Sequence, residues 1–304
     1  MAYEGRCLVS EITGFSTKDG PGIRTSVFLK GCPLRCKWCS NPETFAKEQM
    51  LMFMQNRCVG CGACEEACPE GAIRHGVRTM FRIDRKKCTR CMECVDVCLH
   101  NAFRVSGQYY TVEDLMKVIL RDKIFYGEDG GVTIGGGEPL MSAEFVLEIF
   151  RQCRENEVGT VLDTTGYGDT AKLREILQYT SMALLDLKVM DEEKHLAWTG
   201  VSNKKILENG KIIMETVPTR ISVPFIHGVN SDPENVRATA AFAKEHGAIA
   251  IDLNPLHTLG KGKYHFLGKR SPYGRLEAPS EEELQEAAAI IESYGLPANI
   301  GRMM

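Results

Sequence analysis

The sequence lacks any long apolar stretch: no run approaches the roughly 18 apolar residues that a membrane-spanning helix requires. Its first residues also lack the apolar segment that is typical of a secretory signal. An excess of charge is missing too, because 37 basic and 40 acidic residues leave a net charge of −3. These absences argue against a membrane protein and against a whole-protein surface for nucleic acid. We therefore expect a cytoplasmic protein with neither a membrane nor a nucleic acid as partner.

Cysteine, in contrast, is abundant, with 13 residues in a chain of 304. Many cysteines in a short secreted chain would suggest disulfides, but here they cluster at metal-ligand spacings and no secretory signal is seen. All but Cys7 and Cys153 fall into three motifs. Metal ligation is therefore the better interpretation. Because exposed thiolate-bound iron oxidises readily, we expect the protein to work in reducing, low-oxygen conditions.

The first motif spaces Cys32, Cys36 and Cys39 as C-x3-C-x2-C, with no fourth cysteine nearby. A 4Fe–4S cluster needs four ligands, and thiolates are the usual ones. Three thiolates leave one iron open to a ligand from outside the protein, much as a catalytic zinc site keeps an open position. The motif follows a predicted strand over residues 24–29, and active sites of β/α barrels lie at such C-terminal strand ends.

The other two motifs are runs of four cysteines, each spaced C-x2-C-x2-C-x3-C, within residues 52–103. This is the pattern of bacterial two-cluster ferredoxins, in which the fourth cysteine of each run ligates the other cluster. The pattern assigns one 4Fe–4S cluster to Cys58, Cys61, Cys64 and Cys98 and a second to Cys68, Cys88, Cys91 and Cys94. A proline follows the first run and Leu99 the second, but proline is not a ligand. A pair of structural zinc sites is the alternative, although zinc motifs usually pair two C-x2-C units.

From about residue 104 the sequence alternates short apolar runs with helical periodicity, which predicts parallel β/α units. The first expected strand is residues 24–29, which follows a lead-in loop. The later expected strands are residues 131–134, 158–163, 182–187, 220–223, 248–253 and 297–300. Expected helices are residues 112–121, a helix after Ser142 that buries Cys153, and residues 170–179, 203–213, 233–246 and 281–294. Thr111, Ser142 and Ser280 are the expected caps.

About six such units indicate an α/β fold, an open and partial parallel β/α barrel of about (β/α)6, since a full barrel needs eight. We assign residues 1–51 and 104–304 to this barrel. Residues 52–103 are then a bacterial-ferredoxin-like α+β domain inserted after the first strand. An open barrel leaves a lateral mouth that would suit a large substrate such as another protein.

The three-cysteine loop, together with Gly136-Gly137-Glu138-Pro139, closely resembles the radical S-adenosylmethionine (SAM) superfamily. Within it, three stretches resemble the activating enzymes of glycyl radical enzymes, namely Asp19-Gly20-Pro21-Gly22-Ile23-Arg24, Asp186-Leu187-Lys188 and His257-x-x-Gly260-x-x-Lys263-Tyr264. The likeness covers nearly the whole chain, and the motifs occur in the family's order. The eight-cysteine segment resembles the larger subgroup of these enzymes, which has a two-cluster ferredoxin-like insert.

This resemblance implies a radical SAM oxidoreductase with three 4Fe–4S clusters. Cys32, Cys36 and Cys39 would hold the catalytic cluster, and the amine and carboxylate of SAM would chelate its free iron. One electron would split SAM into methionine and a 5′-deoxyadenosyl radical. That radical would take a hydrogen atom from one glycine, in a C-terminal loop of a partner enzyme, while the protein supplies binding and orientation.

The resemblance also implies roles for single residues. Asp19 matches a residue that contacts the partner's glycine loop. The implied SAM contacts are Trp38, Gly136, Gly137, Glu138, Lys188 and His257. Asp163, Thr164 and Asp186 match a monovalent-cation site, and oxygen ligands suit such a hard cation. These residues also have purely structural interpretations. The glycines could form a flexible turn, the lysine could be solvated, the histidine could be structural, and the aspartates could cap loops or helices.

One position departs from the family. The family often has an arginine for the SAM carboxylate six residues before the glycine of His227-Gly228-Val229-Asn230, and here that position is Ser222. Arg220 lies two residues earlier, and strand residues i and i+2 share a face. We hypothesise that Arg220 reaches over and takes this role.

Two other classes of function compete with an activase. One is a radical SAM enzyme that acts on a small molecule, and the other is a multi-cluster electron-transfer protein without chemistry of its own. The cysteine-rich segment itself has two interpretations. It would either relay electrons from a ferredoxin or flavodoxin to the catalytic cluster, or serve as a docking or structural module.

Overall fold

The structure, a computed structural model, describes residues 5–74, 76 and 79–301. It has an α/β fold around one nine-stranded sheet with the order β11-β10-β9-β8-β7-β6-β2-β1-β5. Neighbouring strands from β2 to β11 pair in parallel, so their carboxyl ends meet at one edge. These parallel strands are β2 (Arg24–Leu29), β6 (Gly131–Gly136), β7 (Gly159–Thr164), β8 (Met182–Asp186), β9 (Thr219–Phe225), β10 (Ala250–Pro255) and β11 (Ala298–Ile300).

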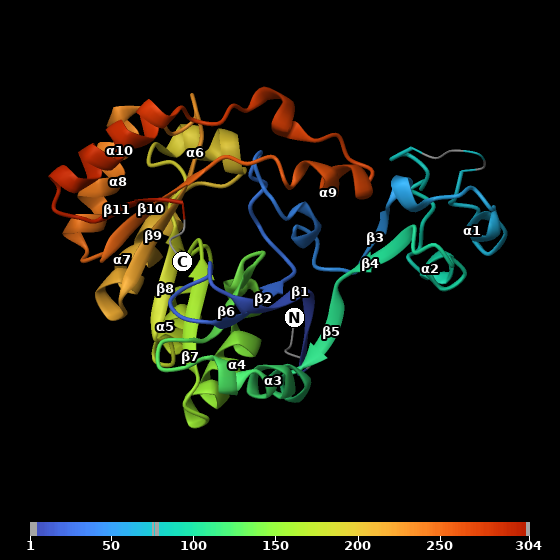
Figure 1. Ribbon diagram of the computed structural model, residues 1–304, viewed down its shortest axis with the longest axis horizontal. Helices are drawn as coiled ribbons and strands as arrows, with labels where there is room; N and C mark the ends of the chain where they lie inside the picture. Colours follow the sequence, from blue (N-terminus) through green and yellow to red (C-terminus); the bar gives the residue numbers. More distant parts are fainter. Residues whose placement is uncertain (1–4, 75, 77–78, 302–304) are drawn as a thin grey trace.

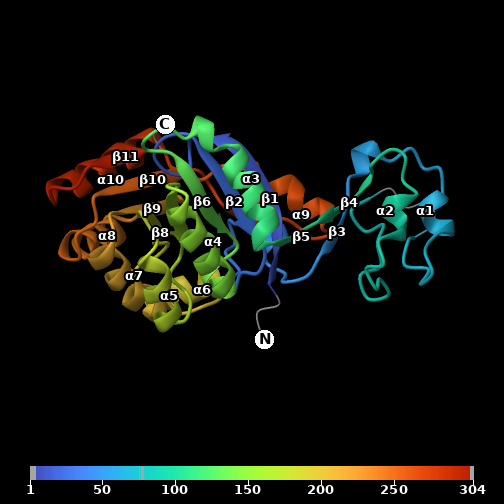
Figure 2. The same cartoon turned by 90° about the horizontal axis from the view of Figure 1, so that it is seen from below.

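Helices follow most of these strands and cover the outer face of the curved sheet (Figure 1; Figure 2). They are α3 (Val112–Arg121), α4 (Ala143–Glu155), α5 (Thr170–Leu177), α7 (Lys204–Thr216), α8 (Pro233–Glu245) and α10 (Glu281–Ser293). Each lies where the apolar periodicity predicts a helix. A further helix, α6 (Glu192–Thr199), was not predicted from the sequence. In the described part of the chain, no helix is both long and apolar enough to cross a membrane.

Two of the three expected side-chain caps are confirmed. The amide of Asp114 donates to Thr111 Oγ1 at 3.1 Å, and Ser280 forms a capping box with Glu283 at the start of α10. The expected cap at Ser142 is wrong, because no side-chain hydrogen bond caps α4 there. A short 3-10 turn, η4 (Pro139–Ser142), precedes α4, and the Ser142 hydroxyl lies 3.3 Å from the Cys7 sulfur.

An antiparallel extension of the sheet was also missed. Residues before Arg24 were expected to be a lead-in loop, but β1 (Arg6–Ser16) pairs antiparallel with β2. Its other edge pairs antiparallel with β5 (Gln108–Thr111), about a hundred residues further along the chain. A strand held by so distant a partner has little local signal, because packing and not intrinsic preference decides it.

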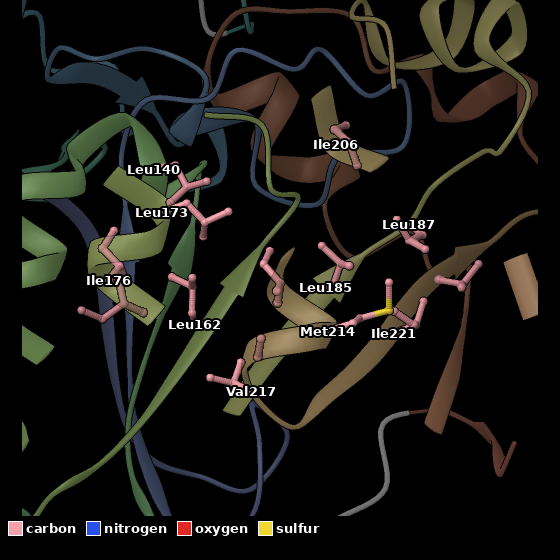
Figure 3. Packing of buried hydrophobic residues seen from close by; sticks show 14 of the residues in the cluster. Leu140, Leu162, Leu173, Ile176, Leu185, Leu187, Ile206, Met214, Val217 and Ile221 are labelled. Carbon is pink, nitrogen blue, oxygen red and sulfur yellow. The ribbon is translucent and has the colours of Figure 1, made fainter. Parts of the chain in front are cut away.

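The main core lies between the sheet and its outer helices. Figure 3 shows Leu162 of β7 and Leu185 of β8 among side chains of α5 and α7, including Leu173 and Met214. Cys153 of α4 is fully buried here, as the helical spacing predicted, and burial raises the pKa of its thiol to about 12. A tightly packed wall of this kind fixes the strand ends that carry the site.

The cysteine-rich segment, residues 52–103, projects to one side of the sheet in both views (Figure 1; Figure 2). At its base, β3 (Met50–Phe53) and β4 (Phe103–Ser106) form a separate antiparallel pair. Two short helices follow, α1 (Ala63–Glu66) and α2 (Glu93–Asp96), and α2 lies nearer to the main sheet than α1 in both figures. The segment has a small core of its own, which includes Phe53, Phe103, Ile73 and Ile83.

Candidate active site

A cavity of about 710 Å³ opens at the carboxyl ends of the parallel strands. The parallel strands β2, β6, β7, β8, β9 and β10 each contribute residues to its wall, from their C-terminal halves or from the loops that follow. The lining includes Asp19, Cys32, Cys36, Trp38, Cys39, Gly136, Gly137, Asp163, Asp186, Lys188, Ser222, Asn254 and His257. This edge is where β/α folds concentrate their chemistry. The fold therefore brings together most of the residues that the sequence singled out.

The three-cysteine loop follows β2 and is fastened on two sides. Its glycine, Gly31, donates its amide to Thr44 O at 2.7 Å. On the other side, the amide of Arg35 donates to Thr199 O at 2.6 Å, and the amide of Lys37 donates to Trp198 O at 3.1 Å. Both of those acceptors belong to the C-terminal turn of α6, where helix carbonyls are left without helical partners. The loop backbone therefore has a fixed path.

Three thiols of this loop face the cavity. Burial raises the pKa of Cys32 to about 12 and also raises the pKa values of Cys36 and Cys39, and the Lys188 ammonium lowers all three in part. Such thiols ionise readily only when a strong positive charge comes near, and a coordinated metal deprotonates its thiols outright. Three sulfurs at one wall of an open cavity, with Cys36 buried and Cys32 and Cys39 partly exposed, therefore fit a thiolate-bound iron–sulfur cluster with one iron left for another ligand.

Two glycines bring β6 close to this loop. Gly136 has φ +104°, and a Cβ there would lie 2.6 Å from the Leu29 amide nitrogen. A Cβ on Gly137 would lie 2.5 Å from Gly31 O. Both positions line the cavity, but the tight approach that requires glycine is to β2 and the loop. Their proposed contact with SAM remains a prediction.

Glu138 lies behind the cavity wall and does not line it. Its carboxylate is 1% exposed and accepts hydrogen bonds from the hydroxyls of Thr164 and Thr165 and from the amides of Leu140 and Thr165. Burial raises the pKa of Glu138, while these hydrogen bonds lower it. Glu138 thereby ties the turn after β6 to the end of β7. Its role toward SAM is untested.

Lys188 is a mostly buried lysine of the cavity wall. Its ammonium donates to Asp186 Oδ2 at 2.9 Å. Burial alone would lower the pKa of Lys188, but the charges of Asp186 and Cys36 outweigh burial and raise it. Lys188 is therefore charged and is held among the three thiols, which suits a lysine that would meet an anionic group of a ligand.

Only two of the three residues of the expected cation site line the cavity. Asp163 and Asp186 both line the cavity. Thr164 instead donates its hydroxyl to Glu138 and accepts from the amide of Gly166 at 2.9 Å. The structure therefore brings the two carboxylates to the cavity but turns the threonine hydroxyl away from it.

Arg220 lies on the inner face of β9, one layer below the cavity. Its guanidinium pairs with Asp252, with Nε 2.9 Å from Asp252 Oδ2, and the same carboxylate accepts from Asn299 Nδ2 at 2.8 Å. Ser222, two residues further on, is the position that lines the cavity. Its hydroxyl accepts from Asn254 Nδ2 at 3.1 Å. Arg220 would have to leave Asp252 to reach a ligand.

The remaining candidates line the cavity at different depths. The Asp19 carboxylate accepts from Ser16 and Ser26 at 2.7 and 2.6 Å, which holds the turn before β2 inside the sheet's curve. Trp38 is buried, and its carbonyl accepts from the Tyr273 hydroxyl at 2.8 Å. His257 follows β10.

Sequence reasoning did not single out Ser222 and Asn254 as a linked pair in the cavity wall, nor α6 as a support of the three-cysteine loop. It also missed Tyr273, which holds Trp38. Nothing in the local sequence indicates that Tyr273 and Trp38, more than 200 residues apart, would meet.

The eight cysteines of residues 52–103 lie in two groups. We call Cys58, Cys61, Cys64 and Cys98 the outer site, and Cys68, Cys88, Cys91 and Cys94 the inner site. Each group lines its own pocket, and Leu51 of β3 also lines the pocket of the inner site. Cys64 is on α1 and Cys94 on α2, so the inner site is the nearer to the main sheet (Figure 1). Each pocket thus contains the four cysteines that the ferredoxin pattern pairs, and the binding of a cluster by either group remains a prediction.

The fold and site define an α/β protein with a three-cysteine loop at the carboxyl ends of parallel strands. The family model described as the radical SAM superfamily matches residues 26–243, and the chain therefore belongs to that superfamily. A solved structure of Streptococcus suis SuiB bound to precursor peptide SuiA aligns with a TM-score of 0.54 at 13% identity, over 88% of this chain and 46% of that chain. That likeness concerns the fold alone.

Curated relatives point to one group within the superfamily. The chain is 36% identical to an indoleacetate decarboxylase activating enzyme from Tractidigestivibacter scatoligenes, over 96% of each chain. It is 39% identical to a trans-4-hydroxy-L-proline dehydratase activating enzyme from Clostridioides difficile, over 97% of this chain and 99% of the relative. An isethionate sulfite-lyase activating enzyme from Nitratidesulfovibrio vulgaris is 36% identical to this chain, over 93% of this chain and 94% of the relative. Within the superfamily, the chain groups with activating enzymes.

Proposed function

We propose that this protein is an activase, a radical SAM oxidoreductase that generates a glycyl radical in a partner enzyme. The single observation that carries the proposal is the cavity wall with Cys32, Cys36 and Cys39. Among the described residues, no other cysteine lines that cavity. Three sulfurs can hold an iron–sulfur cluster and leave one iron to a ligand from outside the chain. The activating-enzyme relatives support the same conclusion.

When bound, a 4Fe–4S cluster and SAM supply one electron and a 5′-deoxyadenosyl radical that takes a hydrogen atom from a glycine α-carbon. The chain's own residues bind and orient these groups. Lys188 offers a charged donor beside the three thiols, and Trp38, Gly136, Gly137 and His257 line the rest of the cavity. Glu138 holds the ends of β6 and β7 together behind them. A cation between Asp163 and Asp186 is part of this proposal, and the Thr164 hydroxyl would have to leave Glu138 to join it.

The partner would be a protein whose C-terminal glycine loop enters the cavity. Asp19 lies at the cavity wall on a turn that two serine hydroxyls hold in place, so it offers a fixed carboxylate to that loop. Residues 1–51 and 104–304 would form an open partial barrel of about six β/α units. Its open side would admit the loop.

Residues 52–103 would be a ferredoxin-like insert with two further 4Fe–4S clusters, which makes three in all. The two pockets with four cysteines each support this part of the proposal. A cytoplasmic ferredoxin or flavodoxin would supply electrons to the insert. The inner site lies on the side of the main sheet, as a relay toward the three-cysteine loop requires (Figure 1).

Electron paramagnetic resonance tests the proposal. Each candidate partner is incubated anaerobically with this protein, SAM and a strong reductant, and a glycyl radical signal is expected in one of them. A variant with Cys36→Ala should give no signal, because the cluster would lose a ligand. If 5′-deoxyadenosine forms but no partner acquires a radical, the small-molecule alternative is favoured. If no 5′-deoxyadenosine forms at all, the protein is an electron carrier and the proposal is wrong.

A further inference from the structure

A direct hydrogen bond from a buried arginine to a cysteine sulfur distinguishes the outer site from the inner site. The side chain of Arg82 is 1% exposed, and its Nη2 donates to the Cys64 sulfur at 3.3 Å. The same guanidinium pairs with Glu65 and lies over the Phe53 ring, 5.8 Å from its centre. A cationic N–H therefore points at one sulfur of the outer site, in surroundings from which water is excluded.

The inner site is built as a near copy of the outer one, and this allows a comparison within one chain. Each cysteine of the second run follows its counterpart in the first by 30 residues, so that Cys94 corresponds to Cys64. Backbone contacts repeat at the same interval: the amide of Ala72 donates to Cys68 Sγ at 3.2 Å, and the amide of Ala102 to Cys98 Sγ at 3.3 Å. Each site thus receives one such amide contact.

Arg82 breaks this repeat. Thirty residues before Arg82 is Met52, which is buried and has no N–H in its side chain. In the described part of the chain, no side-chain hydrogen bond to the Cys94 sulfur is found. The inner site has a partly buried arginine nearby, Arg85, whose charge acts on Cys88 and Cys94. Among the described residues, however, Arg85 donates to the carbonyls of Leu51 and Phe266 and not to a sulfur. The two sites therefore differ in the direct N–H donor that Arg82 gives to the Cys64 sulfur.

The difference bears on reduction potential. Reducing a cluster adds one negative charge, which a nearby positive charge and a hydrogen bond to sulfur both stabilise. The stabilisation is stronger in a buried setting, since the local dielectric is low. Glu65 offsets part of the charge, but it accepts from the guanidinium and leaves the N–H that faces Cys64 in place.

We propose that Arg82 gives the outer cluster a higher reduction potential than the inner cluster, so that an electron taken from a low-potential donor rests at the outer site. One electron passes from the donor to that site, and no bond forms or breaks. This inference rests on the proposed pair of clusters. The outer cluster would then store the electron. The inner cluster, with the lower potential, would pass the electron on toward the main sheet.

The test is a redox titration followed by electron paramagnetic resonance, on the full chain with Cys32, Cys36 and Cys39 replaced by alanine so that only the insert is reduced. The outer and inner clusters should differ by at least tenfold in their one-electron equilibrium, which corresponds to about 59 mV. Arg82→Met places the residue found at position 52 beside Cys64. It should shift the one-electron equilibrium of the outer cluster at least tenfold toward the oxidised form, which lowers its potential by about 59 mV or more, while the inner potential stays unchanged.

Three further variants separate the causes. Arg82→Lys keeps the charge and should retain part of the effect. Arg74→Met removes an arginine of the same segment that is 52% exposed and pairs with Asp84, and it should change neither potential. Glu65→Gln combined with Arg82→Met should still show the lowered outer potential, because the lost donor and not the remaining carboxylate is the cause.

Equal potentials in the unsubstituted insert, or an outer potential that Arg82→Met and Arg82→Lys leave unchanged, would overturn the inference. Iron content and absorbance are measured on each sample before titration. If the unsubstituted chain holds no pair of 4Fe–4S clusters, the proposed insert is wrong. If only Arg82→Met fails to hold its clusters, Arg82→Lys still decides the question.

Discussion

Three charged side chains in or behind the cavity wall are held by specific partners. Lys188 is fixed by Asp186, Glu138 by two threonine hydroxyls, and Arg220 by Asp252. A buried charge without such a partner would be costly, so these contacts decide which groups remain ionised in the wall. The arrangement leaves Lys188 facing the three thiols while Arg220 is turned to a carboxylate below.

Arg220→Ala tests whether Arg220 also serves the SAM carboxylate. Removing one partner of a buried ion pair costs about 3–5 kcal/mol. Because the Arg220 side chain is 26% exposed, we expect a smaller loss in the free energy of unfolding, about 2 kcal/mol. Binding of SAM, measured by calorimetry on the cluster-loaded protein, should also weaken, at least several-fold.

The control is Arg220→Ala combined with Asp252→Asn, which removes the unpaired carboxylate. This double variant should recover most of the stability but not the affinity for SAM. An unchanged affinity in Arg220→Ala would limit Arg220 to its role as the partner of Asp252.

At the level of single elements, α6 has the most direct bearing on the site. Its last turn accepts the amides of Arg35 and Lys37, and its Trp198 ring lies 4.6 Å from Lys37 Nζ and 6.2 Å from the Trp38 ring. The helix ends at Gly200, which has φ +82° and forms the left-handed C-cap that favours glycine. A short helix with few buried apolar residues thus acts as the support of the three-cysteine loop.

Trp198→Ala should loosen that loop. The contacts of an indole with a lysine and with a second aromatic ring contribute about 0.5–1.5 kcal/mol each. We expect a loss of bound iron from the three-cysteine site and at least a several-fold weaker affinity for SAM, with little change in the circular dichroism spectrum.

Trp198→Phe is the matched control and should keep most of both properties, since a ring remains over Lys37. Equal iron content and equal affinity in Trp198→Ala and the unsubstituted protein would show that the backbone hydrogen bonds of α6 suffice.

Across the whole molecule, two bodies with separate cores meet through a narrow base. The cysteine-rich segment leaves the main sheet at β3 and returns at β4, and Arg85 pins it there by donating to Leu51 O in β3 and to Phe266 O at the end of α9 (Lys261–Phe266). Lys263 of α9 in turn donates to Asn41 and Glu43, just after the three-cysteine loop. A continuous set of contacts therefore joins the segment to the site.

Cys61→Ala and Cys91→Ala, made together, test the relay. Each removes a ligand of one insert cluster and leaves the three-cysteine loop intact. With reduced ferredoxin or flavodoxin as donor, activation of the partner should fall at least tenfold, because the path through the insert is broken. With dithionite, which reaches the catalytic cluster directly, cleavage of SAM should continue. Full activity with the physiological donor would rule out the relay and favour a docking role for the segment.

Periodicity and spacing were enough to predict most β/α elements, because helix and strand repeats in the sequence follow directly from which face is buried. The same is true of the caps at Thr111 and Ser280, where the donor lies three residues away. The prediction of a side-chain cap at Ser142 was wrong because a 3-10 turn precedes α4 and changes the local backbone geometry. β1 and α6 were missed because their partners lie far away in the chain.

The amino-acid sequence alone therefore determined the cysteine motifs, the α/β class and the resemblance to a family, all of which depend on short-range spacing. Only the folded chain decided that Glu138 and Thr164 turn away from the cavity, that Arg220 pairs with Asp252, and that Arg82 meets Cys64. These are contacts between side chains on different elements. Their partners are selected by packing and by the cost of leaving a buried polar group unpaired, which no local pattern records.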